Sequence, residues 1–255
     1  MESGRLSACM VLCHSGEKAV RTVDCLEKST EVVDTWIVDN SPEEDTADRI
    51  RWAHPGVHVL PQRKNVGFGR ANNAVLNLIQ SDYHLLVNPD VTFEPDLLTR
   101  MIEYMDQHSN VVILTPKVLN PDGSVQYLPK KQPTVRYLAS GRLERFGGPF
   151  PALRADFTMS GQVIRKPVRV QFATGCFLLI RTEAFKELKG FDERFFLYQE
   201  DSDLSRRAGE LGPIIYHPDF QVTHEWHRDS AHSLKAMWHH LVSTVKFFSK
   251  WGWTW

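Results

Sequence analysis

The first half of the chain alternates between short apolar runs and apolar residues at helical spacing. Runs of four or five apolar residues bounded by turn formers are typical of buried strands, whereas apolar residues every three or four positions indicate a helix. The pattern predicts strands over residues 8–12, 35–38, 57–60, 83–87 and 111–114. It predicts helices between them, over residues 20–26, 46–52, 71–79 and 95–105. This alternation predicts an α/β fold whose twisted sheet is mostly parallel and flanked by helices.

The alternation stops between residues 128 and 167 and returns afterwards. The interrupted stretch holds eight basic and two acidic residues, which gives +6, so the rest of a chain of net charge −1 totals −7. An irregular insertion of this length in a compact domain is usually functional or mobile. Beyond it the pattern predicts strands over 177–180 and 214–216, a helix over 201–211 and an amphipathic helix over 234–248.

Composition excludes several classes of protein. Of 255 residues 42% are hydrophobic and 24% charged, which is ordinary for a globular protein and excludes a disordered, collagen-like or coiled-coil chain. A net charge of −1 gives no general attraction to nucleic acid, so no nucleic-acid partner is expected. We expect no membrane span, because no apolar run reaches about 18 residues, and no signal peptide. Four cysteines without a C-x-x-C pair fit buried thiols in a cytoplasmic protein.

Polar side chains follow four successive predicted strands. His14 follows the first strand, Asp39 the second, Asn65 the third, and Asn88 and Asp90 the fourth. Ligands of open parallel sheets bind beyond the carboxyl ends of the strands, so these groups predict a ligand site at one edge. One carboxylate with substrate phosphate oxygens commonly holds Mg²⁺ or Mn²⁺, which makes Asp90 a candidate metal ligand. A simple tight turn is the alternative for Asn-Pro-Asp.

The glycines after the third strand resemble a dinucleotide-binding loop only superficially. Gly67 and Gly69 precede a predicted helix, but Asn72 stands where the third glycine would be, and the loop does not follow the first strand. A nicotinamide-dependent enzyme is therefore not expected. The glycines allow a phosphate or a sugar to approach the backbone beside Arg70; the alternative is a tight strand-to-helix turn.

An aromatic-rich segment delivers three carboxylates to the start of a predicted helix. Glu200, Asp201 and Asp203 follow the sequence FFLYQ. Carboxylates are favoured at helix N-termini, so capping is one explanation, but three acids exceed what a single cap requires. A carboxylate among aromatic walls can acquire the basicity of a general base.

Three histidines follow the last predicted strand. His224, His227 and His232 lie close together, and a neutral imidazole is a good ligand for a divalent cation. Their spacing is too short for the zinc-protease helix signature. Surface histidines are the alternative.

The ordered set of motifs resembles one known family. The set comprises the strand-end Asp39, NVGFGRANN at 65–73, NPD at 88–90, TGCFLLIR at 174–181, GFDERFFLYQEDSDLSRR at 190–207 and HEWHRDS at 224–230. It resembles the family 2 glycosyltransferases of the GT-A fold, and looks most like rhamnosyltransferases of bacterial surface-polysaccharide assembly. The similarity runs from about residue 7 to about residue 250. It implies one domain over 1–255, with a sugar-nucleotide-binding half (7–115), an acceptor-binding and catalytic half (116–230), and a C-terminal amphipathic helix and tail (231–255).

The resemblance implies a role for each matching position. Asp201 matches the catalytic base, and Asp90 matches the last acid of the family's D-x-D metal motif, whose first acid is here Asn88. His224 matches a histidine near the metal and the pyrophosphate, so the implied ligands of Mg²⁺ or Mn²⁺ are Asp90 and His224. The implied substrate-binding residues are His14, Asp39, Asn65, Gly67, Gly69, Arg70, Asn88, Thr174, Gly175, Glu200 and Arg207.

The implied activity is inverting transfer of a sugar from a nucleoside diphosphate sugar to a saccharide hydroxyl. It requires Asp90 and Asp201 to face one cleft. The favoured donor is dTDP-L-rhamnose, with UDP-galactose, UDP-glucose and other sugars open, and the implied acceptor is a saccharide on polyprenyl pyrophosphate. The basic insertion and the C-terminal helix would then contact the cytoplasmic face of the membrane as a peripheral protein; alternatively, the helix covers the sheet.

Two other functions remain open from the sequence. One is a catalytically silent subunit that binds a sugar nucleotide or a glycan, although a silent relative could lose Asp90, Asp201 and His224 freely. The other is a nucleotidyltransferase on a similar sheet. Such enzymes usually have a glycine-rich loop and a lysine after the first strand, whereas this chain has HSGE at 14–17.

Overall fold

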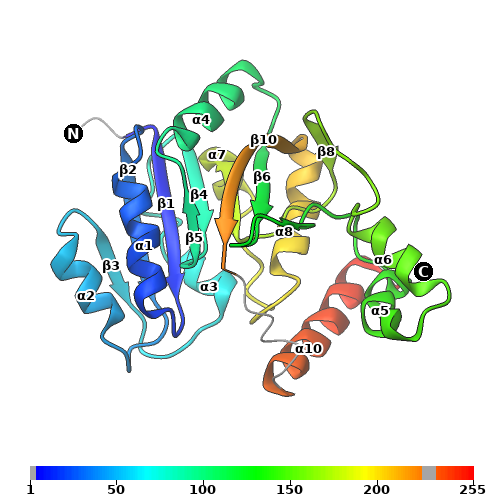
Figure 1. The fold of residues 1–255 in the computed structure, drawn as a ribbon. Coiled ribbons are helices and arrows are strands. Elements are labelled where there is room, and N and C mark those ends of the chain that lie inside the picture. The colour runs from blue at the N-terminus through cyan, green and yellow to red at the C-terminus, as the bar shows by residue number, and fades with distance from the viewer. Residues whose placement is uncertain (1–3, 226–233) are drawn as a thin grey trace.

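The computed structural model describes residues 4–225 and 234–255, and in these ranges ten strands form one sheet (Figure 1). The sheet order is β3-β2-β1-β4-β9-β6-β10-β5, with β7 paired to β6 and β8 to β10. The strands are β1 (Leu6–Leu12), β2 (Val33–Asp39), β3 (His58–Pro61), β4 (Tyr83–Val87), β5 (Val91–Phe93), β6 (Ile113–Leu119), β7 (Val125–Gln126), β8 (Val168–Val170), β9 (Phe177–Arg181) and β10 (Ile214–His224).

Helices flank the sheet, as the sequence predicts (Figure 1). They are α1 (Gly16–Glu27), α2 (Thr46–Ala53), α3 (Phe68–Asn73), α4 (Leu97–Gln107), α5 (Val135–Leu143), α6 (Phe150–Phe157), α7 (Thr182–Glu187), α8 (Glu200–Leu211) and α10 (Leu234–Trp251), with a 3₁₀ turn at Glu144–Phe146. The first half of the sheet is parallel, because β1 pairs in parallel with β2 and β4, and β2 with β3. The second half adds antiparallel pairs through β9, β5, β7 and β8. The expected α/β fold is confirmed.

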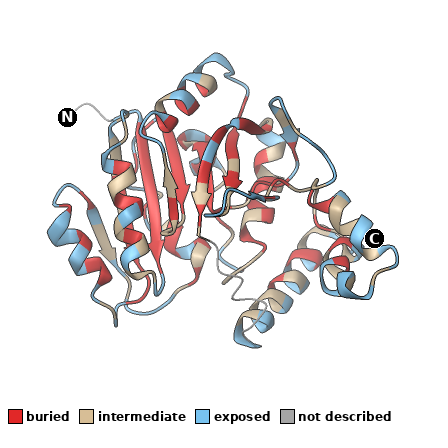
Figure 2. Cartoon of the chain, viewed as in Figure 1, coloured by how far each residue is buried: buried red, intermediate tan, exposed pale blue. Residues whose placement is uncertain are grey.

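Both faces of the sheet are buried (Figure 2). Alternate residues of β1 divide between two hydrophobic clusters: Leu6, Ala8, Met10 and Leu12 join the cluster on the side of α1 and α4, and Cys9 and Val11 join the cluster on the side of α3, α7 and α8. Successive strand side chains point to opposite faces, so a strand covered on both sides has to be apolar throughout. This explains why the strands appear in the sequence as continuous apolar runs.

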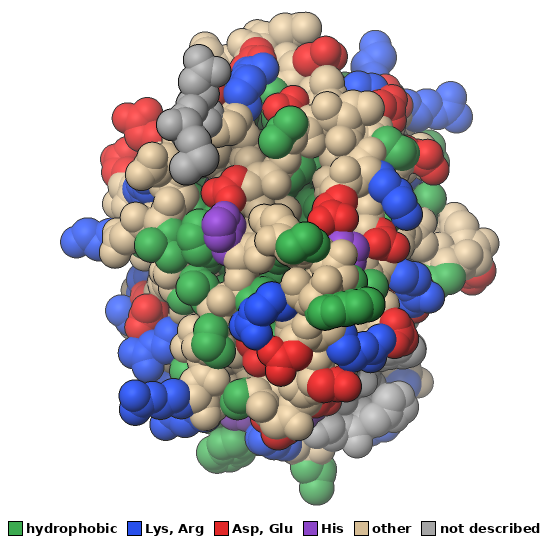
Figure 3. All heavy atoms as spheres, turned by 90° about the vertical axis from the view of Figure 1, so that its left-hand side faces the viewer, with side chains coloured by type: hydrophobic (Ala, Val, Ile, Leu, Met, Phe, Trp, Pro, Cys, Tyr) green, Lys and Arg blue, Asp and Glu red, His purple; other side chains and the backbone are tan. Residues whose placement is uncertain are grey.

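The outer surface on the side of α2 carries both charges (Figure 3). Lysine and arginine side chains alternate there with aspartate and glutamate, as in the pair of Arg51 with Asp48 at 2.6 Å. Among the described residues, no helix has both the length and the apolar character needed to cross a membrane. The cysteines are free; Cys9 and Cys176 are buried as expected, Cys25 is half-buried and Cys13 is exposed.

The C-terminal helix α10 packs on the domain by one face only. Phe247 and Phe248 are buried against Phe195, in a third hydrophobic cluster that residues of α5 also contact. On the opposite side, Leu234, Trp238 and Leu241 are 81%, 63% and 45% exposed. The helix therefore covers part of the domain and also presents an apolar stripe.

The basic insertion is not irregular. It contains α5 and α6, whose apolar residues reach inward: Tyr137 and Phe157 are buried and their rings stack with centroids 5.2 Å apart. Helices of eight or nine residues hold too few turns for their spacing to stand out, which is why the sequence pattern predicts a loop.

The helix predicted over 71–79 is regular only over α3. Beyond Asn73 most backbone bonds span three residues, as from the Leu78 N–H to the Val75 carbonyl at 2.8 Å. The carboxamide of Asn73 binds the backbone of Phe191, accepting at 2.8 Å and donating at 2.9 Å. The buried residues Val75 and Ile79 keep the predicted apolar face.

Strand β10 is much longer than the predicted 214–216. Its pairing with β6 shifts register between His217 and Gln221, where the sequence is polar and contains Pro218. The bulge interrupts the apolar pattern, so the second half of the strand cannot be recognised from the sequence. That half ends at His224.

Candidate functional site

A cavity of about 580 Å³ lies where β1 and β4 end, as predicted for a parallel sheet; we call it the rim cavity. Four residues predicted to bind substrate line it: His14, Asn65, Gly67 and Asn88. The predicted metal ligands Asp90 and His224 also line it. The rim cavity thus gathers residues from the ends of several strands.

Asp90 and His224 meet because β5 pairs antiparallel with β10. The pairing sets Val91 opposite His224, and the Glu225 N–H donates to the Asp90 carbonyl at 2.9 Å. Oδ1 of Asp90 lies 3.1 Å from Nε2 of His224. Both atoms are buried, and within the described residues neither has a partner in hydrogen-bond geometry.

Gln126 determines which nitrogen of His224 is protonated. Its amide nitrogen donates to the His224 carbonyl at 2.7 Å, so its Oε1, 3.1 Å from Nδ1, accepts the Nδ1 proton. In the neutral tautomer with the proton on Nδ1, Nε2 carries the lone pair that a metal ligand requires. A carboxylate oxygen and an imidazole nitrogen that face each other at 3.1 Å fit a divalent cation such as Mn²⁺ or Mg²⁺.

The protein supplies few ligands for such a cation. Within residues 4–225 and 234–255, no group of three His, Cys, Asp or Glu side chains is placed to hold a metal. His227 and His232 lie outside the described residues. Phosphate oxygens of a ligand and water would have to complete the coordination.

A second cavity, of about 370 Å³, lies at the start of α8; we call it the helix cavity. Asp201 lines it, together with Thr174, Gly175 and Glu200, as the resemblance implies. Oδ2 of Asp201 accepts from the Gly175 N–H at 3.3 Å and Oδ1 from the Ser202 N–H at 2.8 Å. These donors hold the carboxylate in place and favour its ionised form.

Burial shifts the pKa values of the neighbouring carboxyl groups of Asp201 and Glu200. Burial raises the pKa of Asp201, but Lys130 and backbone N–H donors act against that rise. Burial and the charge of Asp201 raise the pKa of Glu200 well above its usual value. The larger rise at Glu200 favours protonation there, which leaves Asp201 as the better candidate for a general base.

Two more buried acceptors point to a polyhydroxyl ligand in the helix cavity. Oε1 of Gln199 and Oε2 of Glu200 are buried and have no hydrogen-bond partner among the described residues. Both residues line the cavity and are at least nine-tenths buried. Buried polar atoms normally have partners, so a ligand with hydroxyl groups fits them.

An unusual backbone conformation places Asp201 in the cavity. Tyr198 and Gln199 have φ of 69° and 68°, the left-handed region that non-glycine residues rarely adopt. The glycine at position 67 lets this segment approach closely, because a Cβ there would lie 2.4 Å from the Phe196 carbonyl oxygen. The next N–H, that of Phe68, donates to the same oxygen at 3.0 Å.

The two cavities adjoin. They share five lining residues: Phe68, Asn88, Leu197, Tyr198 and His224. Asp90 lines the rim cavity and Asp201 the helix cavity, so the two acids lie in neighbouring cavities. In place of the expected single cleft, the structure has two adjoining cavities.

Four residues predicted to bind substrate line neither cavity. Asp39 is 7% exposed and its Oδ1 accepts from the Ser41 N–H at 3.1 Å, while its neighbour Asn40 reaches the rim cavity. Gly69 packs closely on the Phe191 side chain. These two positions support the shape of the site, and a substrate contact at either stays a prediction.

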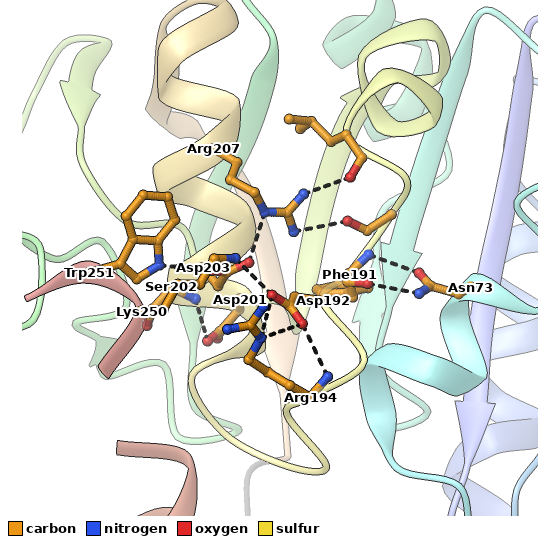
Figure 4. A network of polar contacts seen from close by, with 12 residues as sticks. Asn73, Phe191, Asp192, Arg194, Asp201, Ser202, Asp203, Arg207, Lys250 and Trp251 are labelled. Atoms are coloured by element: carbon orange, nitrogen blue, oxygen red, sulfur yellow. Dashed lines mark hydrogen bonds and ion pairs between the residues drawn. The ribbon is translucent and has the colours of Figure 1, made fainter. Parts of the chain in front are cut away.

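Arg70 and Arg207 are engaged by protein groups. Arg70 pairs with Glu193 at 2.7 Å. Arg207 donates to Asp203 at 2.8 Å and to the carbonyls of Leu188 and Gly190 (Figure 4). The structure thus gives both arginines a structural role.

Sequence reasoning missed several residues of the site. Lys130 and Arg154 line the helix cavity, and the positive charge of the insertion is the signal that could have found them. Gln126 carries no such signal, because its role depends entirely on the pairing of β7 with β6 next to β10. His240 reaches the helix cavity from α10.

Comparison with known families decides the classification. The model of "Glycosyl transferase family 2" matches residues 7–189. The chain belongs to glycosyltransferase family 2. The family segment contains Asp90 and most of the residues that line the rim cavity, whereas Asp201 and His224 lie beyond its matched boundary.

The curated relatives of this glycosyltransferase include rhamnosyltransferases. It is 30% identical over 235 residues to the N-acetylglucosaminyl-diphospho-decaprenol L-rhamnosyltransferase of Mycobacterium tuberculosis, covering 85% of this chain and 75% of the relative. It is 26% identical over 198 residues to rhamnosyltransferase WbbL of Escherichia coli K12, covering 72% of this chain and 70% of that one.

Solved structures confirm the GT-A-type fold. The mannosyltransferase PcManGT of Pyrobaculum calidifontis, in complex with GDP-Man and Mn²⁺, matches with a TM-score of 0.64 at 14% identity. GalNAc-T7 with UDP, GalNAc and Mn²⁺ matches with a TM-score of 0.66, also at 14% identity. The matches cover 98% and 97% of this glycosyltransferase but only 65% and 48% of those chains.

Proposed function

We propose that this glycosyltransferase transfers L-rhamnose, with inversion, from dTDP-L-rhamnose to a hydroxyl of a saccharide linked to polyprenyl pyrophosphate. The observation that carries the proposal is the pair of adjoining cavities, one lined by Asp90 and His224 and the other by Asp201. The named rhamnosyltransferase relatives support the choice of sugar and of acceptor.

The rim cavity is the proposed donor site. Asn40, Asn65 and the Gly67 loop bind the nucleotide, and Lys18 adds a positive charge at the cavity wall. Asp90 and His224 would hold the divalent cation, which offsets the negative charge that develops on the departing diphosphate. This places the bond to be broken near the residues that line both cavities.

The helix cavity is the proposed acceptor site. Asp201 accepts the proton of the attacking hydroxyl, whose oxygen forms a bond to the anomeric carbon as the bond to the diphosphate oxygen breaks. The transfer is a single direct displacement with one base, so the hydroxyl attacks the face opposite the leaving group and configuration inverts. Protonated Glu200 and the Gln199 amide bind other hydroxyls of the acceptor.

A donor screen tests the proposal. Thermal stabilisation by dTDP-L-rhamnose, UDP-galactose and UDP-glucose is measured with Mn²⁺, with Mg²⁺ and with chelator, followed by turnover assays on a lipid-linked saccharide. A ligand at 100 times its Kd stabilises by about 2.7 kcal/mol, so real donors are easily detected. Stabilisation by UDP sugars alone would reassign the donor. Binding without any turnover would favour the silent-subunit function.

The proposal includes a peripheral contact with the membrane that carries the acceptor lipid. Leu234, Trp238, Leu241 and Val245 recur at three- and four-residue steps and are exposed, so they form the apolar stripe of α10. Deleting α10 would also remove the buried Phe247 and Phe248. The test is therefore Trp238→Ser with Leu241→Ser, which should reduce co-sedimentation with anionic vesicles; Trp52→Ser, at an exposed tryptophan on α2, is the matched control.

Equal co-sedimentation of both variants and of the wild-type protein would contradict the membrane contact.

The division of the domain into halves at 7–115 and 116–230 also stays a prediction. His224 and Phe196, from the second half, line the donor cavity, so the two halves share the site.

A further inference from the structure

The segment that leads into α8 lines both cavities. It comprises residues 192–199, and we call it the aromatic segment. Four of its residues line the cavities: Phe196 the rim cavity, Gln199 the helix cavity, and Leu197 and Tyr198 both. The proposed base, Asp201, follows two positions later. The course of the aromatic segment therefore decides where that carboxylate lies.

A backbone contact ties the aromatic segment to the donor side of the site. The Phe68 N–H donates to the Phe196 carbonyl at 3.0 Å. Beyond this contact, Tyr198 and Gln199 adopt the left-handed backbone conformation, with φ of 69° and 68°. Residues other than glycine keep such a conformation only where their surroundings hold it. The approach to Asp201 therefore requires further contacts.

Helix α10 donates two hydrogen bonds to the aromatic segment. The Ser243 hydroxyl donates to the Leu197 carbonyl at 2.8 Å, and Ser243 is 2% exposed. The Lys246 ammonium donates to the Arg194 carbonyl at 2.7 Å. These bonds fix the backbone just before the two left-handed residues.

Two histidine rings of α10 pack on the same segment. The His239 ring stacks on the Phe196 ring with centroids 4.7 Å apart, and the His240 and Tyr198 rings lie 5.3 Å apart. His240 also lines the helix cavity itself. The middle of α10 thus follows the aromatic segment along much of its length and reaches the cavity that holds Asp201.

We propose that α10 is part of the acceptor site, with Ser243 and Lys246 as positioning residues that hold the aromatic segment so that Gln199 and Asp201 lie in the helix cavity. Neither is among the residues that line the two cavities, so both act through the segment. The inference rests on the proposed transfer reaction. It adds to the site a helix outside residues 7–189, the part of the chain that the family model matches.

Ser243→Ala tests the buried contact. Steady-state turnover is measured with dTDP-L-rhamnose and with N-acetylglucosaminyl diphosphate that carries a short prenyl chain. The variant should lower kcat/KM for this acceptor by about 5-fold or more, because the Leu197 carbonyl loses its hydroxyl donor. KM for the donor should not change, because the Phe196 carbonyl keeps its contact with Phe68.

Lys246 allows rescue by a conservative variant, because its side chain is exposed and an arginine fits in its place. Lys246→Met removes the donor to the Arg194 carbonyl and should lower the same kcat/KM by about 2-fold or more. Lys246→Arg keeps a donor there and should restore the wild-type value. Ser243→Ala combined with Lys246→Met should lower kcat/KM further than either change alone.

Hydrogen exchange followed by mass spectrometry examines the segment without turnover. Ser243→Ala should speed exchange of the backbone amides of residues 192–203 by about 5-fold or more, because local opening becomes easier. Ser81→Ala is the matched control. The buried hydroxyl of Ser81 donates to the Tyr83 carbonyl, also at 2.8 Å, but it precedes β4, whose opposite end reaches the rim cavity. This variant should leave both the exchange of residues 192–203 and the acceptor kcat/KM at wild-type values.

Three results would overturn the inference. The first is a Ser243→Ala variant in which either the acceptor kcat/KM or the exchange of residues 192–203 is unchanged. The second is an equal loss of kcat/KM in Ser81→Ala, and the third is a Lys246→Arg variant no better than Lys246→Met. If Ser243→Ala does not fold, the two Lys246 variants decide by the same measurements.

Failure of the proposed function gives a different result. In that case the wild-type protein turns over no acceptor, whereas faster exchange in Ser243→Ala and wild-type exchange in Ser81→Ala would still show that α10 holds the aromatic segment. Exchange that is unchanged in both variants would overturn the inference independently of any turnover.

Discussion

The ammonium of Lys250, in the last turn of α10, lies 2.5 Å from Oδ1 of Asp203 in the first turn of α8 (Figure 4). Asp203 is fully buried, and Trp251 and Arg207 also donate to it, each at 2.8 Å. Asp203 stands two positions after Asp201. The contact therefore fastens the C-terminal helix to the helix that carries the proposed base.

Asp203→Ala should lower the free energy of unfolding by about 3–5 kcal/mol, because it removes the buried carboxylate to which Arg207, Lys250 and Trp251 donate; Lys250 then keeps its pair with Asp192. Chemical denaturation measures the loss. The matched control is Arg194→Gln, which removes a half-exposed partner of Asp192 and should cost about 1 kcal/mol or less. If the two variants lose the same free energy of unfolding, the burial of Asp203 does not contribute to stability.

The parallel half of the fold could be predicted from the sequence, and the rest could not. Strands such as β1 and β4 are covered on both faces, so their apolar runs stand out. The short strand β5 and the bulged strand β10 leave no such run, yet their pairing places His224 beside Asp90. The sequence therefore indicates Asp90 and His224 separately as candidate metal ligands, and only the family resemblance joins them into one pair.

Motif order predicted the composition of the site better than its contacts. Asp201 and Glu200 line the expected cavity, because they begin a helix that the sequence marks clearly. Arg207 follows the same motif, but one helical turn after Asp203 it pairs with that buried acid. Lys130 and Gln126 act through contacts between distant segments, which no local pattern contains.

Asp201→Asn should lower kcat by at least about 100-fold and leave donor binding unchanged, since the amide keeps the shape of the side chain but cannot accept the proton. Steady-state turnover and donor titration measure the two effects. Glu200→Gln is the matched control, because the neutral amide resembles the protonated carboxyl, and it should keep kcat within about 10-fold of the wild type. Near-normal turnover of Asp201→Asn would remove it as the base.

Asp90→Ala should weaken Mn²⁺-dependent binding of the nucleoside diphosphate by at least about 10-fold. Loss of a group that merely orients a metal ligand costs 10–100-fold in affinity, and loss of a ligand should cost no less. Titration with and without chelator measures the affinity, and chelator should lower the affinity of the wild-type protein to that of the variant. Asp82→Ala, at an exposed acid before β4, is the control. If chelator does not change the affinity of the wild-type protein for the nucleoside diphosphate, a role for the metal in binding is contradicted.

Glu200→Gln should stabilise the protein increasingly as pH rises above about 4.5, until the pKa of Glu200 in the folded protein is reached. Burial and Asp201 raise the pKa of Glu200 well above 4.5, so above that pH the folded protein keeps a proton that the unfolded chain releases. Stability of the wild type then falls by up to about 1.4 kcal/mol per pH unit until the folded pKa is reached, and the glutamine variant lacks this loss. Thermal unfolding at successive pH values should show Tm curves that meet near pH 4 and separate above it. Glu210→Gln, at an exposed position of α8, should run parallel to the wild type. If the Glu200→Gln curve also runs parallel, Glu200 is ionised in the folded protein, and the assignment of the single negative charge to Asp201 is wrong.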